Sequence, residues 1–331
     1  MGILGIETSC DETSVAFVEE GRVVRQLIAS QVEAHRPYHG VVPELASRHH
    51  LQNLPVLMRE LGRAVDLRKV EAVAVTQGPG LVGALLVGVA FAKGFAAARR
   101  LPLVPVNHIE AHLYSPFIGR SVPADFLGLV VSGSHASLYR VRRGRLQRLA
   151  RTRDDAPGEA YDKVAKLFGL PYPGGPEIDR LYPQGDPGAF DLPLPKMSDG
   201  SLDLSFSGLK SHIAYRFHKG FRPRRRGRLT PQALDLLASF QSAVVRHLLH
   251  RVEALHRLHP VRHLSVSGGV AANAHLRERT LAWASGRGVE AHFPPTDYIT
   301  DNAGMVAHLA WRRGKARPPA EVDADPGLEL N

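Results

Sequence analysis

The sequence predicts an α/β protein built from two duplicated lobes, and three observations carry this prediction. The first is length, because 331 residues exceed one ordinary core and suit two lobes of roughly 100 to 200 residues each. The second is an internal repeat, and the third is a strand, a glycine turn and a helix later in each half. With 44% hydrophobic and 22% charged residues, the composition is that of a globular protein rather than a disordered or fibrous one.

The internal repeat aligns residues 4–22 with residues 127–145 without gaps. Seven of the 19 aligned positions are identical, where composition alone gives roughly one or two. Each copy is typical of an apolar strand, a small polar turn, a second strand, and a Gly-Arg turn into a third strand. Both lobes are therefore expected to begin with the same three-stranded meander.

A strand followed by a glycine turn and a helix is expected at residues 72–80 and again at residues 264–269. Such a duplicated lobe is similar to the RNase-H-like plan of the actin/Hsp70/sugar-kinase superfamily, in which glycine turns present backbone N–H groups to phosphate in a cleft between the lobes. We expect an N-terminal lobe at 1–105 and a C-terminal lobe at 106–312, with a last helix able to pack back on the first lobe. The tail at 313–331, rich in proline and small residues, is expected to be disordered.

The sequence favours a cytoplasmic protein without a membrane anchor. Cys10 is the single cysteine, which excludes an internal disulfide and a cysteine-based zinc site, and no N-terminal signal is visible. Residues 81–98 are long enough to span a bilayer and carry only Lys93 as a charge. Their three glycines and the strand-like flanks instead favour a helix buried between a sheet and another layer.

The chain has a net charge of +10, and its basic residues are clustered. One cluster comprises Arg140, Arg142, Arg143, Arg145, Arg148, Arg151 and Arg153, and the other comprises Lys219, Arg222, Arg224, Arg225, Arg226 and Arg228. Each cluster alone is commonly a solvated hairpin or loop. Two of them in one basic chain favour a nucleic-acid partner, because Lys and Arg supply affinity for phosphate.

The pentapeptide HIEAH places His108 and His112 one helical turn apart, so both imidazoles can coordinate one ion. Asp301 is a candidate third ligand, and two histidines with a carboxylate suit iron(II) or zinc with open positions. The alternative is that the two histidines are helix-surface or capping residues. A zinc protease is disfavoured, because Glu110 stands one position later than in His-Glu-x-x-His and is turned roughly 200° from His108.

The second lobe carries small residues and carboxylates that suit a nucleotide. In the segment 131–135 and around Gly175, small side chains would let a ligand touch backbone. Asp162 and Asp179 are of the type that accepts hydrogen bonds from ribose hydroxyls. The alternative for each aspartate is a helix N-cap or a turn carboxylate.

Seven motifs in order resemble those of the TsaD family of tRNA threonylcarbamoyladenosine-forming transferases, whose older name is O-sialoglycoprotein endopeptidase. They are IETSCDETS at 6–14, HIEAH at 108–112, GEAYDK at 158–163, YPGGP at 172–176, SFSGLK at 205–210, GGVAAN at 268–273 and TDN at 300–302. The resemblance covers residues 1–312. One departure is Ser134, which stands where the family usually has glycine and adds a side chain where backbone approaches ligand. The basic loop 218–228 is particular to this chain.

The resemblance implies transfer of the threonylcarbamoyl group from threonylcarbamoyl-AMP to the exocyclic amine of the adenosine beside the anticodon, in tRNAs reading codons that begin with A. It implies a metal ion, Fe²⁺ in the first place and Zn²⁺ as the alternative, on His108, His112 and Asp301. The implied nucleotide and substrate contacts are Val131, Ser132, Gly133, Ser134, His135, Asp162, Gly175, Asp179 and Asn273. The implied partners are tRNA, a paralogous TsaB-type subunit, a small TsaE-type ATPase and an upstream TsaC-type synthase that makes the adenylate.

For the mechanism, we expect backbone amides of the segment 132–135 and of Gly268 and Gly269 to hold the adenylate phosphate. The attacking aryl amine is weakly basic, so a base must take its proton, and Asp11 or Glu12 on the first-lobe turn is the candidate. The paralogous subunit is expected to dock on the helix at residues 44–61.

The main rival function is a nucleotide-gated regulatory ATPase or scaffold of the same fold. The two histidines of HIEAH count against it, because a kinase or chaperone of this fold does not need them. A small-molecule carbamoyltransferase is a third alternative, and the clustered arginines count against it.

Overall fold

The computed structural model describes residues 1–195, 197–219, 221–225 and 228–330, and the chain divides into two compact units. Unit 1 comprises Met1–Val122 and Pro294–Asn331, and unit 2 comprises Pro123–Phe293. These units differ from the expected lobes at 1–105 and 106–312. The reason is that residues 106–122 continue from the last strand of the first sheet and pack in unit 1, and that the chain returns to unit 1 at residue 294.

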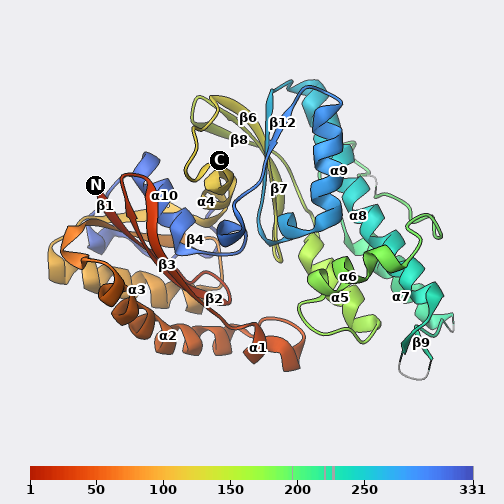
Figure 1. Ribbon diagram of the computed structural model, residues 1–331, viewed down its shortest axis with the longest axis horizontal. Coiled ribbons are helices and arrows are strands. Elements are labelled where there is room, and N and C mark those ends of the chain that lie inside the picture. Colours follow the sequence, from red (N-terminus) through yellow and green to blue (C-terminus); the bar gives the residue numbers. More distant parts are fainter. Residues whose placement is uncertain (196, 220, 226–227, 331) are drawn as a thin grey trace. The chain divides into compact units, whose positions relative to one another are not determined.

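Unit 1 is built on a five-stranded sheet in the order β3-β2-β1-β4-β5 (Figure 1). Its strands are β1 (Gly2–Glu7), β2 (Glu12–Glu19), β3 (Arg22–Ser30), β4 (Val70–Gly78) and β5 (Leu103–Asn107). The first three form an antiparallel meander, whereas β4 and β5 run parallel to β1. All six residues of β1 are buried, as expected for a central strand covered on both faces.

Unit 2 repeats this sheet with the order β12-β11-β6-β7-β8. Its strands are β6 (Asp125–Val131), β7 (Ala136–Arg142), β8 (Arg145–Arg151), β11 (His263–Ser267) and β12 (Glu290–His292). Again the first three form an antiparallel meander and the later two run parallel to the first. A separate two-stranded ribbon consists of β9 (Arg224–Arg225) and β10 (Arg228–Leu229).

The predicted duplication is confirmed at the level of single turn residues. The tight turn between β2 and β3 has Glu20 at φ 51° and Gly21 at φ 76°, and the turn between β7 and β8 has Arg143 at φ 49° and Gly144 at φ 76°. Two successive residues with positive φ are typical of a two-residue hairpin turn that matches the twist of the strands. The identical Gly-Arg pairs of the repeat therefore mark the same turn in both units.

The helices of unit 1 are α1 (Val32–His35), α2 (Pro43–Ala64), α3 (Val82–Arg99), α4 (His108–Tyr114) and α10 (Ala303–Arg313). Short 3₁₀ helices lie at Arg36–Tyr38, Leu67–Lys69, Ser115–Phe117, Thr296–Tyr298 and Pro319–Glu321. Helices α2 and α3 pack against each other and on β2 and β4, whereas α10 packs on β1, β2 and α4. The last helix thus packs on the first sheet, as the sequence allowed.

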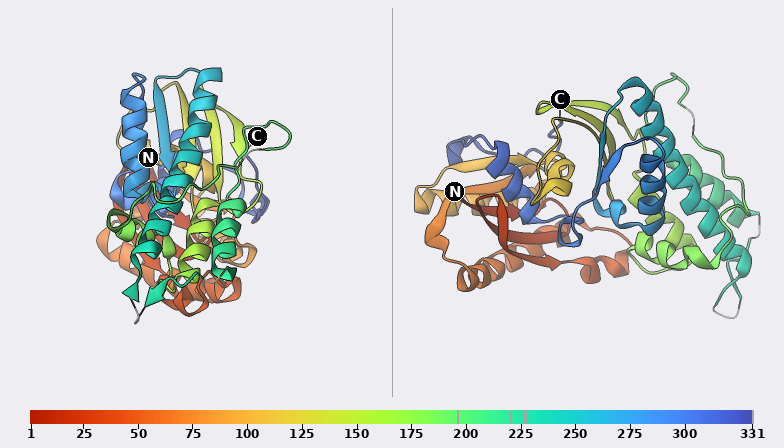
Figure 2. Two further views of the ribbon diagram at one scale, coloured as in Figure 1. Left: turned by 90° about the vertical axis from the view of Figure 1, so that its right-hand side faces the viewer. Right: turned by 45° about the horizontal axis from the view of Figure 1, so that its top comes forward.

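The helices of unit 2 are α5 (Pro157–Leu167), α6 (Gly174–Leu181), α7 (Ser207–His218), α8 (Pro231–Leu258) and α9 (Ala274–Ser285), with 3₁₀ helices at Tyr182–Gln184 and Gly269–Ala272. Helices α8 and α9 lie side by side, as Figure 1 and Figure 2 show. Together with α5, α6 and α7 they contribute to one apolar core with the inner residues of the sheet.

Gly5 on β1 sets how closely α10 approaches the sheet. A Cβ at this position would lie 2.4 Å from the Ala303 carbonyl oxygen and 2.9 Å from the Ala307 Cβ. Only glycine lets the first turn of α10 lie against the strand at this distance. This close packing fixes the start of α10, and with it Asp301 two residues earlier.

The apolar helix expected at 81–98 is α3, Val82–Arg99. By length and composition it is apolar enough to cross a membrane, and 33% of it is buried. One face, including Ala84, Leu85 and Gly88, is buried in unit 1, where Thr8 Oγ1 donates a hydrogen bond to the Ala84 carbonyl at 2.9 Å. The helix is therefore covered on one side by the sheet and α2, rather than on all sides.

The tail expected to be disordered packs against unit 1. The Asp325 N–H donates to the Gln77 carbonyl at 2.8 Å, Leu103 and Arg317 form a β-bridge, and Val322 is fully buried. These backbone bonds and the buried valine supply the order that the composition of the segment did not indicate.

The first basic cluster lies on the hairpin β7–β8 and its flank, where Arg140 donates two hydrogen bonds to Asp125 and Arg153 pairs with Asp199 and Asp203. Arg143 and Arg145 at the hairpin turn are exposed. Of the second cluster, Arg224 donates to the carbonyls of Phe168 and Gly169. Arg226 and residue 227 of the basic loop lie outside the described residues.

Candidate metal centre and ligand-binding loops

The two histidines of HIEAH are held by the junction of β5 and α4. Asn107 ends the strand and caps the helix, because its side-chain oxygen accepts a hydrogen bond from the Glu110 N–H at 3.1 Å. His108 is thus the first helical residue and His112 lies one turn later on the same side. Both histidines are buried.

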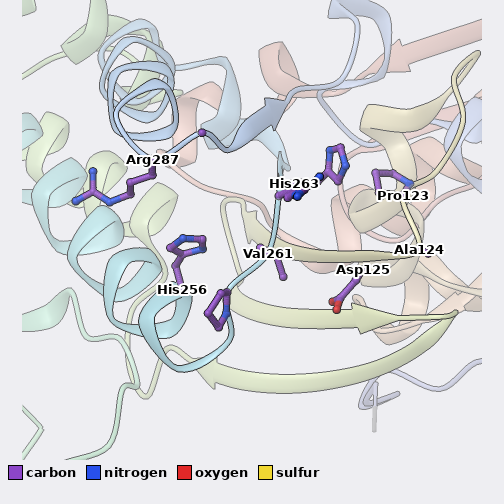
Figure 3. A pocket seen from close by; sticks show the side chains of 10 residues that line it. Pro123, Ala124, Asp125, His256, Val261, His263 and Arg287 are labelled. Carbon is purple, nitrogen blue, oxygen red and sulfur yellow. The ribbon is translucent and has the colours of Figure 1, made fainter.

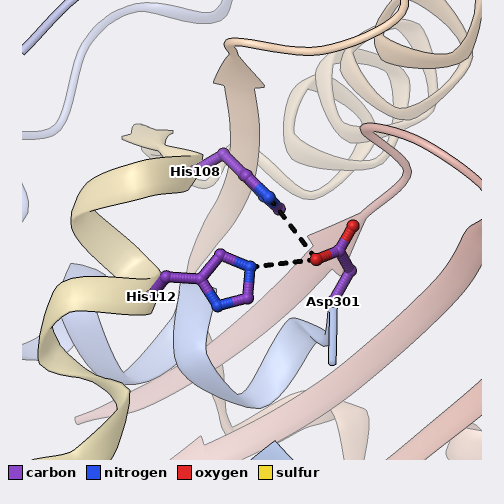
Figure 4. A group of neighbouring side chains, drawn as sticks. All are labelled: His108, His112 and Asp301. Atoms are coloured by element: carbon purple, nitrogen blue, oxygen red, sulfur yellow. Dashed lines mark hydrogen bonds and ion pairs between the residues drawn. The ribbon is translucent and has the colours of Figure 1, made fainter. Parts of the chain in front are cut away.

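Asp301 lies beside these histidines, although it belongs to the C-terminal segment of unit 1. It precedes Asn302, which caps α10 by accepting a hydrogen bond from the Met305 N–H at 2.8 Å. Asp301 Oδ1 lies 2.9 Å from His112 Nε2 and 3.5 Å from His108 Nε2, as Figure 4 shows. The structure therefore brings the three predicted metal ligands together, although 189 residues separate His112 from Asp301.

This group fits the coordination shell of a divalent metal ion. The ligand atoms of His108, His112 and Asp301 all lie within 4.8 Å of one another. Ligands about 2.1 Å from one ion are about 3 to 3.5 Å apart, which matches the two measured separations from the carboxylate oxygen. The two rings stand at 90° to each other, so their nitrogens approach one point from different directions.

Glu7 supports this centre, and the sequence reasoning did not identify it as a site residue. Its fully buried carboxylate lies 3.1 Å from His108 Nδ1 and accepts a hydrogen bond from Thr76 Oγ1 at 2.6 Å. Ser9 Oγ also lies 3.2 Å from His108 Nδ1. A carboxylate on the far nitrogen of a ligand histidine fixes the ring and its tautomer. The sequence feature that could have indicated Glu7 is its place as the one polar residue at the end of the otherwise apolar strand β1.

The protonation of the two histidines differs. Burial opposes the charge on His108, but the carboxylates of Asp301 and Glu7 raise its pKa to about 9. For His112, burial lowers the pKa more than Asp301 raises it. Near neutral pH, without a metal ion, His108 is therefore a positively charged imidazolium and His112 is neutral.

We expect metal uptake at this centre to release a proton. Below pH 9 the proton on His108 competes with the ion, so affinity should rise with pH by up to about tenfold per unit and level off above the pKa of about 9. Isothermal titration in buffers of different ionisation enthalpy measures the release. A His108→Ala variant should lose both the pH dependence and most of the affinity. Binding that is independent of pH between 6 and 8 would contradict the assignment of His108 as a ligand.

Of the two candidate bases, Asp11 ends the turn after β1 and Glu12 is the first residue of β2. Burial, with the neighbouring carboxylates of Asp11 and Asp301, raises the pKa of Glu12 well above its ordinary value. Ser30 Oγ donates a weak hydrogen bond to Glu12 Oε1 at 3.4 Å. The charge of Asp301 therefore acts on this turn, and Glu12 has the raised basicity that a general base needs.

Glu110 is turned away from the metal ligands. Its carboxylate pairs with Arg313 on α10 at 2.9 Å. A protease base would have to lie beside the ion-bound water, so this geometry gives no support to a metallopeptidase.

In unit 2 the segment 131–135 forms the loop between β6 and β7. The Ser132 N–H donates to the His135 carbonyl at 2.8 Å, and Ser134 Oγ lies 2.9 Å from His135 Nδ1. The N–H groups at the start of α5 bind the loop, since Gly158 donates to the Ser132 carbonyl and Glu159 to the Gly133 carbonyl. Ser134 is exposed and its hydroxyl is engaged by His135 rather than by buried backbone.

Asp162 and Asp179, two further predicted contact residues of unit 2, each accept hydrogen bonds from the start of a helix. Asp162 Oδ1 accepts from the Gly174 N–H beside Gly175, at 2.6 Å. Asp179 accepts from Gln241 Nε2 and from the Ala274 N–H, each at 2.8 Å. Both aspartates thus also have the structural role that the sequence left open, which is to bind helix N-termini.

Gln241 joins these groups and was not identified from the sequence. It donates to Asp179, and its oxygen accepts from Asn273 Nδ2 at 3.0 Å, while Asn273 caps α9 through the Leu276 N–H. Gly268 packs directly against the end of β6, because a Cβ there would lie 2.3 Å from the Val131 carbonyl oxygen. Asp179, Gln241 and Asn273 thus form one hydrogen-bonded group at the start of α9, and Gly269 follows the turn at Gly268.

Comparison with protein families gives one match over most of the chain. The model of the family described as TsaD, tRNA N6-adenosine threonylcarbamoyltransferase, matches residues 22–308. A tRNA N6-adenosine threonylcarbamoyltransferase of Geobacter sulfurreducens is 50% identical over 311 residues, 93% of this chain and 90% of that protein. One of Thermotoga neapolitana is 44% identical over 337 residues, with 100% of both chains covered.

Solved structures resemble the chain at the level of the fold. Full-length HypF has a TM-score of 0.58 at 14% identity, over 93% of this chain and 54% of that chain. The activator of the 2-hydroxyisocaproyl-CoA dehydratase from Clostridium difficile has a TM-score of 0.54 at 14% identity, over 94% and 95% of the two chains. At this identity the likeness concerns the fold, and it agrees with the predicted superfamily.

Proposed function

The chain belongs to the TsaD family of tRNA N6-adenosine threonylcarbamoyltransferases, and we propose that it transfers the threonylcarbamoyl group from threonylcarbamoyl-AMP to the exocyclic amine of the adenosine 3′ of the anticodon in tRNAs reading ANN codons. The reaction forms a bond from the adenosine N6 to the carbamoyl carbon and breaks the bond from that carbon to the phosphate oxygen, so that AMP leaves. The observation that carries the proposal is the meeting of His108, His112 and Asp301 in a chain that aligns with a family member over the whole of both sequences.

We propose that these three residues hold one divalent ion, Fe²⁺ in preference to Zn²⁺. Two imidazoles and one carboxylate with open positions suit either ion. When bound, the ion would supply Lewis-acid polarisation and a template for substrate oxygens. Glu7 keeps the His108 ring oriented through Nδ1.

Backbone amides and carboxylates of the chain would bind the adenylate and remove the proton from the amine. The backbone amides of Gly133, Ser134 and Gly269 would bind the adenylate phosphate, since those of Ser132 and His135 donate within the loop. Asp162 and Asp179 would lie near the ribose, with Gly175 and Asn273 beside them. Glu12, or Asp11 beside it, would take the proton from the attacking amine. The departing AMP carries the electron pair of the broken bond.

Transfer of a labelled threonylcarbamoyl group tests the reaction directly. Threonylcarbamoyl-AMP carrying labelled threonine would be mixed with unmodified tRNA and the protein, together with its partner proteins. The proposal predicts label in tRNA and one AMP per group transferred. A regulatory ATPase of the same fold predicts no label in tRNA and no release of AMP, and that result would overturn the proposal.

For tRNA we propose that the exposed arginines of the β7–β8 turn contribute phosphate contacts. Reversing two of them in Arg143→Glu/Arg145→Glu should raise the KM for tRNA on the order of tenfold and flatten its salt dependence, with little change in kcat. Arg312→Glu/Lys315→Glu is the matched control, since both residues are exposed and the net charge changes equally. Equal effects of the two variants would argue for bulk charge instead of a local contact.

We propose that α2 is the docking face for the paralogous TsaB-type subunit. Two large apolar side chains on it, Leu51 and Val56, are 62% and 48% exposed. Leu51→Glu/Val56→Glu should abolish co-elution with that subunit while circular dichroism and melting temperature stay unchanged, because neither side chain is in the core. Normal co-elution of this variant would place the interface elsewhere.

A TsaE-type ATPase and a TsaC-type synthase complete the proposed set of partners, the second as the source of threonylcarbamoyl-AMP. The proposed location is the cytoplasm, where unmodified tRNA is available. A single cysteine, which is free, is compatible with a reducing compartment.

A further inference from the structure

A second group of metal-type ligands lies on the sheet of unit 2, away from every residue assigned above. Within the described part of the chain, two groups of histidine and carboxylate side chains could hold an ion, and the second comprises His263, Glu290 and His292. His263 begins β11, and the other two residues stand at either end of the three-residue edge strand β12.

The strand register explains why these side chains meet. In the parallel pair of β11 and β12, His263 stands opposite Glu290, and Ser265 stands opposite His292. Glu290 and His292 are two residues apart, so their side chains point to the same face of the sheet. One face of two neighbouring strands therefore presents two imidazoles and a carboxylate.

The distances match one coordination shell. His263 Nδ1 lies 3.1 Å from His292 Nε2 and 3.5 Å from Glu290 Oε2. Two ligands of a tetrahedral zinc ion with bonds near 2.0 to 2.1 Å are about 3.3 Å apart. The ring centroids are 5.3 Å apart, and one ligand atom from each of the three residues lies within 4.8 Å of the others.

We propose that His263, Glu290 and His292 bind a second divalent transition-metal ion, with Zn²⁺ as the expected occupant. Two imidazoles and one carboxylate are ligands of intermediate softness, which suits zinc, cobalt or nickel better than magnesium or calcium. All three ligands belong to unit 2, whereas His108, His112 and Asp301 all belong to unit 1. Each centre is therefore complete within its own unit, and the second does not depend on the proposed transfer reaction.

The ligands are accessible to an ion. The Glu290 side chain is 67% exposed and that of His263 is 31% exposed, while His292 is 9% exposed and provides the buried anchor. His263 also lines a hollow of about 630 Å³, bordered by His256 and Arg287 among others, as Figure 3 shows. Solvent can thus reach the cluster from the carboxylate and from the hollow, which gives an entry path.

The bound ion would tie the edge strand to the sheet. Strand β12 pairs with β11 alone, and His292 comes just before the point where the chain leaves unit 2 at Phe293. Two ligands on β12 and one on β11 would add a link across this pair of strands. The ion would therefore contribute to the stability of this edge of the sheet.

Metal stoichiometry of the full-length protein tests this inference. Protein stripped with a chelator would be titrated with Zn²⁺ against a chromophoric chelator, and with Co²⁺ followed by its visible absorption. His263→Ala/His292→Ala should bind one ion fewer than wild type, and His108→Ala/His112→Ala should retain that ion. If the metal centre of unit 1 fails to take Zn²⁺, wild type should bind a single ion that only the first variant loses.

Two further variants guard against misfolding and non-specific binding. Glu290→Gln changes an exposed side chain and should keep the fold while weakening the second ion at least tenfold. His250→Ala, an exposed histidine on α8 of the same unit, should leave both ions bound as in wild type. Unchanged stoichiometry and affinity in both Glu290→Gln and the histidine variant would overturn the proposal.

Discussion

Asp301→Ala is expected to reduce kcat/KM for tRNA modification on the order of a hundredfold or more and to remove tightly bound metal from unit 1. The reason is that Asp301 Oδ1 lies close to both histidines, 2.9 Å from His112 Nε2 and 3.5 Å from His108 Nε2. Charge stabilisation by a metal ion contributes several kcal/mol, and each 1.4 kcal/mol is about a factor of ten in rate. Steady-state kinetics, with metal analysis of the same preparation, measures both losses.

Asp297→Ala is the matched control for Asp301→Ala. Asp297 is an exposed residue of the same type, four positions earlier, and its backbone carbonyl rather than its side chain accepts the hydrogen bond from Gln26. This variant should keep wild-type activity and metal content. If Asp301→Ala stays active with metal bound, then the three-residue centre is not the catalytic one.

Gly268→Ala is expected to destabilise unit 2 by about 2 to 4 kcal/mol. Gly268 has φ 88° and ψ 164°, a conformation that only glycine adopts without strain. A Cβ would also lie 2.3 Å from the Val131 carbonyl oxygen, so the end of β6, from which the loop 132–135 starts, must move. Denaturant unfolding followed by circular dichroism gives the loss of stability.

The neighbouring residue offers a control that separates folding from binding. A Cβ at Gly269 has no atom within 4 Å. The free energy of unfolding of Gly269→Ala should therefore lie within about 0.5 kcal/mol of the wild-type value. If the amide at this turn holds phosphate, Gly269→Ala should nevertheless weaken nucleotide binding. Equal stability of Gly268→Ala and wild type would contradict the description of this turn.

The duplicated fold was predictable because its signals are local. Positive φ at Gly21 and Gly144 demands glycine in the same hairpin turn, so the repeat survives in the sequence as identical letters. The unit boundaries could not be predicted from local signals. They depend on the packing of α10 on β1 at Gly5, which contacts Ala303 and Ala307 far along the chain. The tail likewise gained order from β4, which composition does not reveal.

The metal ligands were predictable for a similar reason. His108 and His112 share a helix face at a spacing of four, and Asp301 came from its own motif. Glu7 escaped notice because a single glutamate after an apolar strand has no characteristic spacing to His108. Its role depends on the order β1-β4-β5 in the sheet, which brings Thr76 on β4 and His108 after β5 to the carboxylate.

In unit 2, Gln241 and the His263, Glu290 and His292 group were not predicted. Gln241 lies within the long helix α8, where its buried position gives no sign of bonds to Asp179 and Asn273. The second group depends on the register of two parallel strands joined by α9, and parallel register cannot be read from either strand alone.

Mass spectrometry of nucleosides is the most direct test of the proposed function. Unmodified tRNA would be incubated with the protein, its partner proteins, threonine, bicarbonate and ATP, then digested and analysed, with His108→Ala in parallel. Threonylcarbamoyl-adenosine in the wild-type reaction alone is the predicted result. Its absence from the wild-type reaction while the partner proteins still form threonylcarbamoyl-AMP would contradict the proposal.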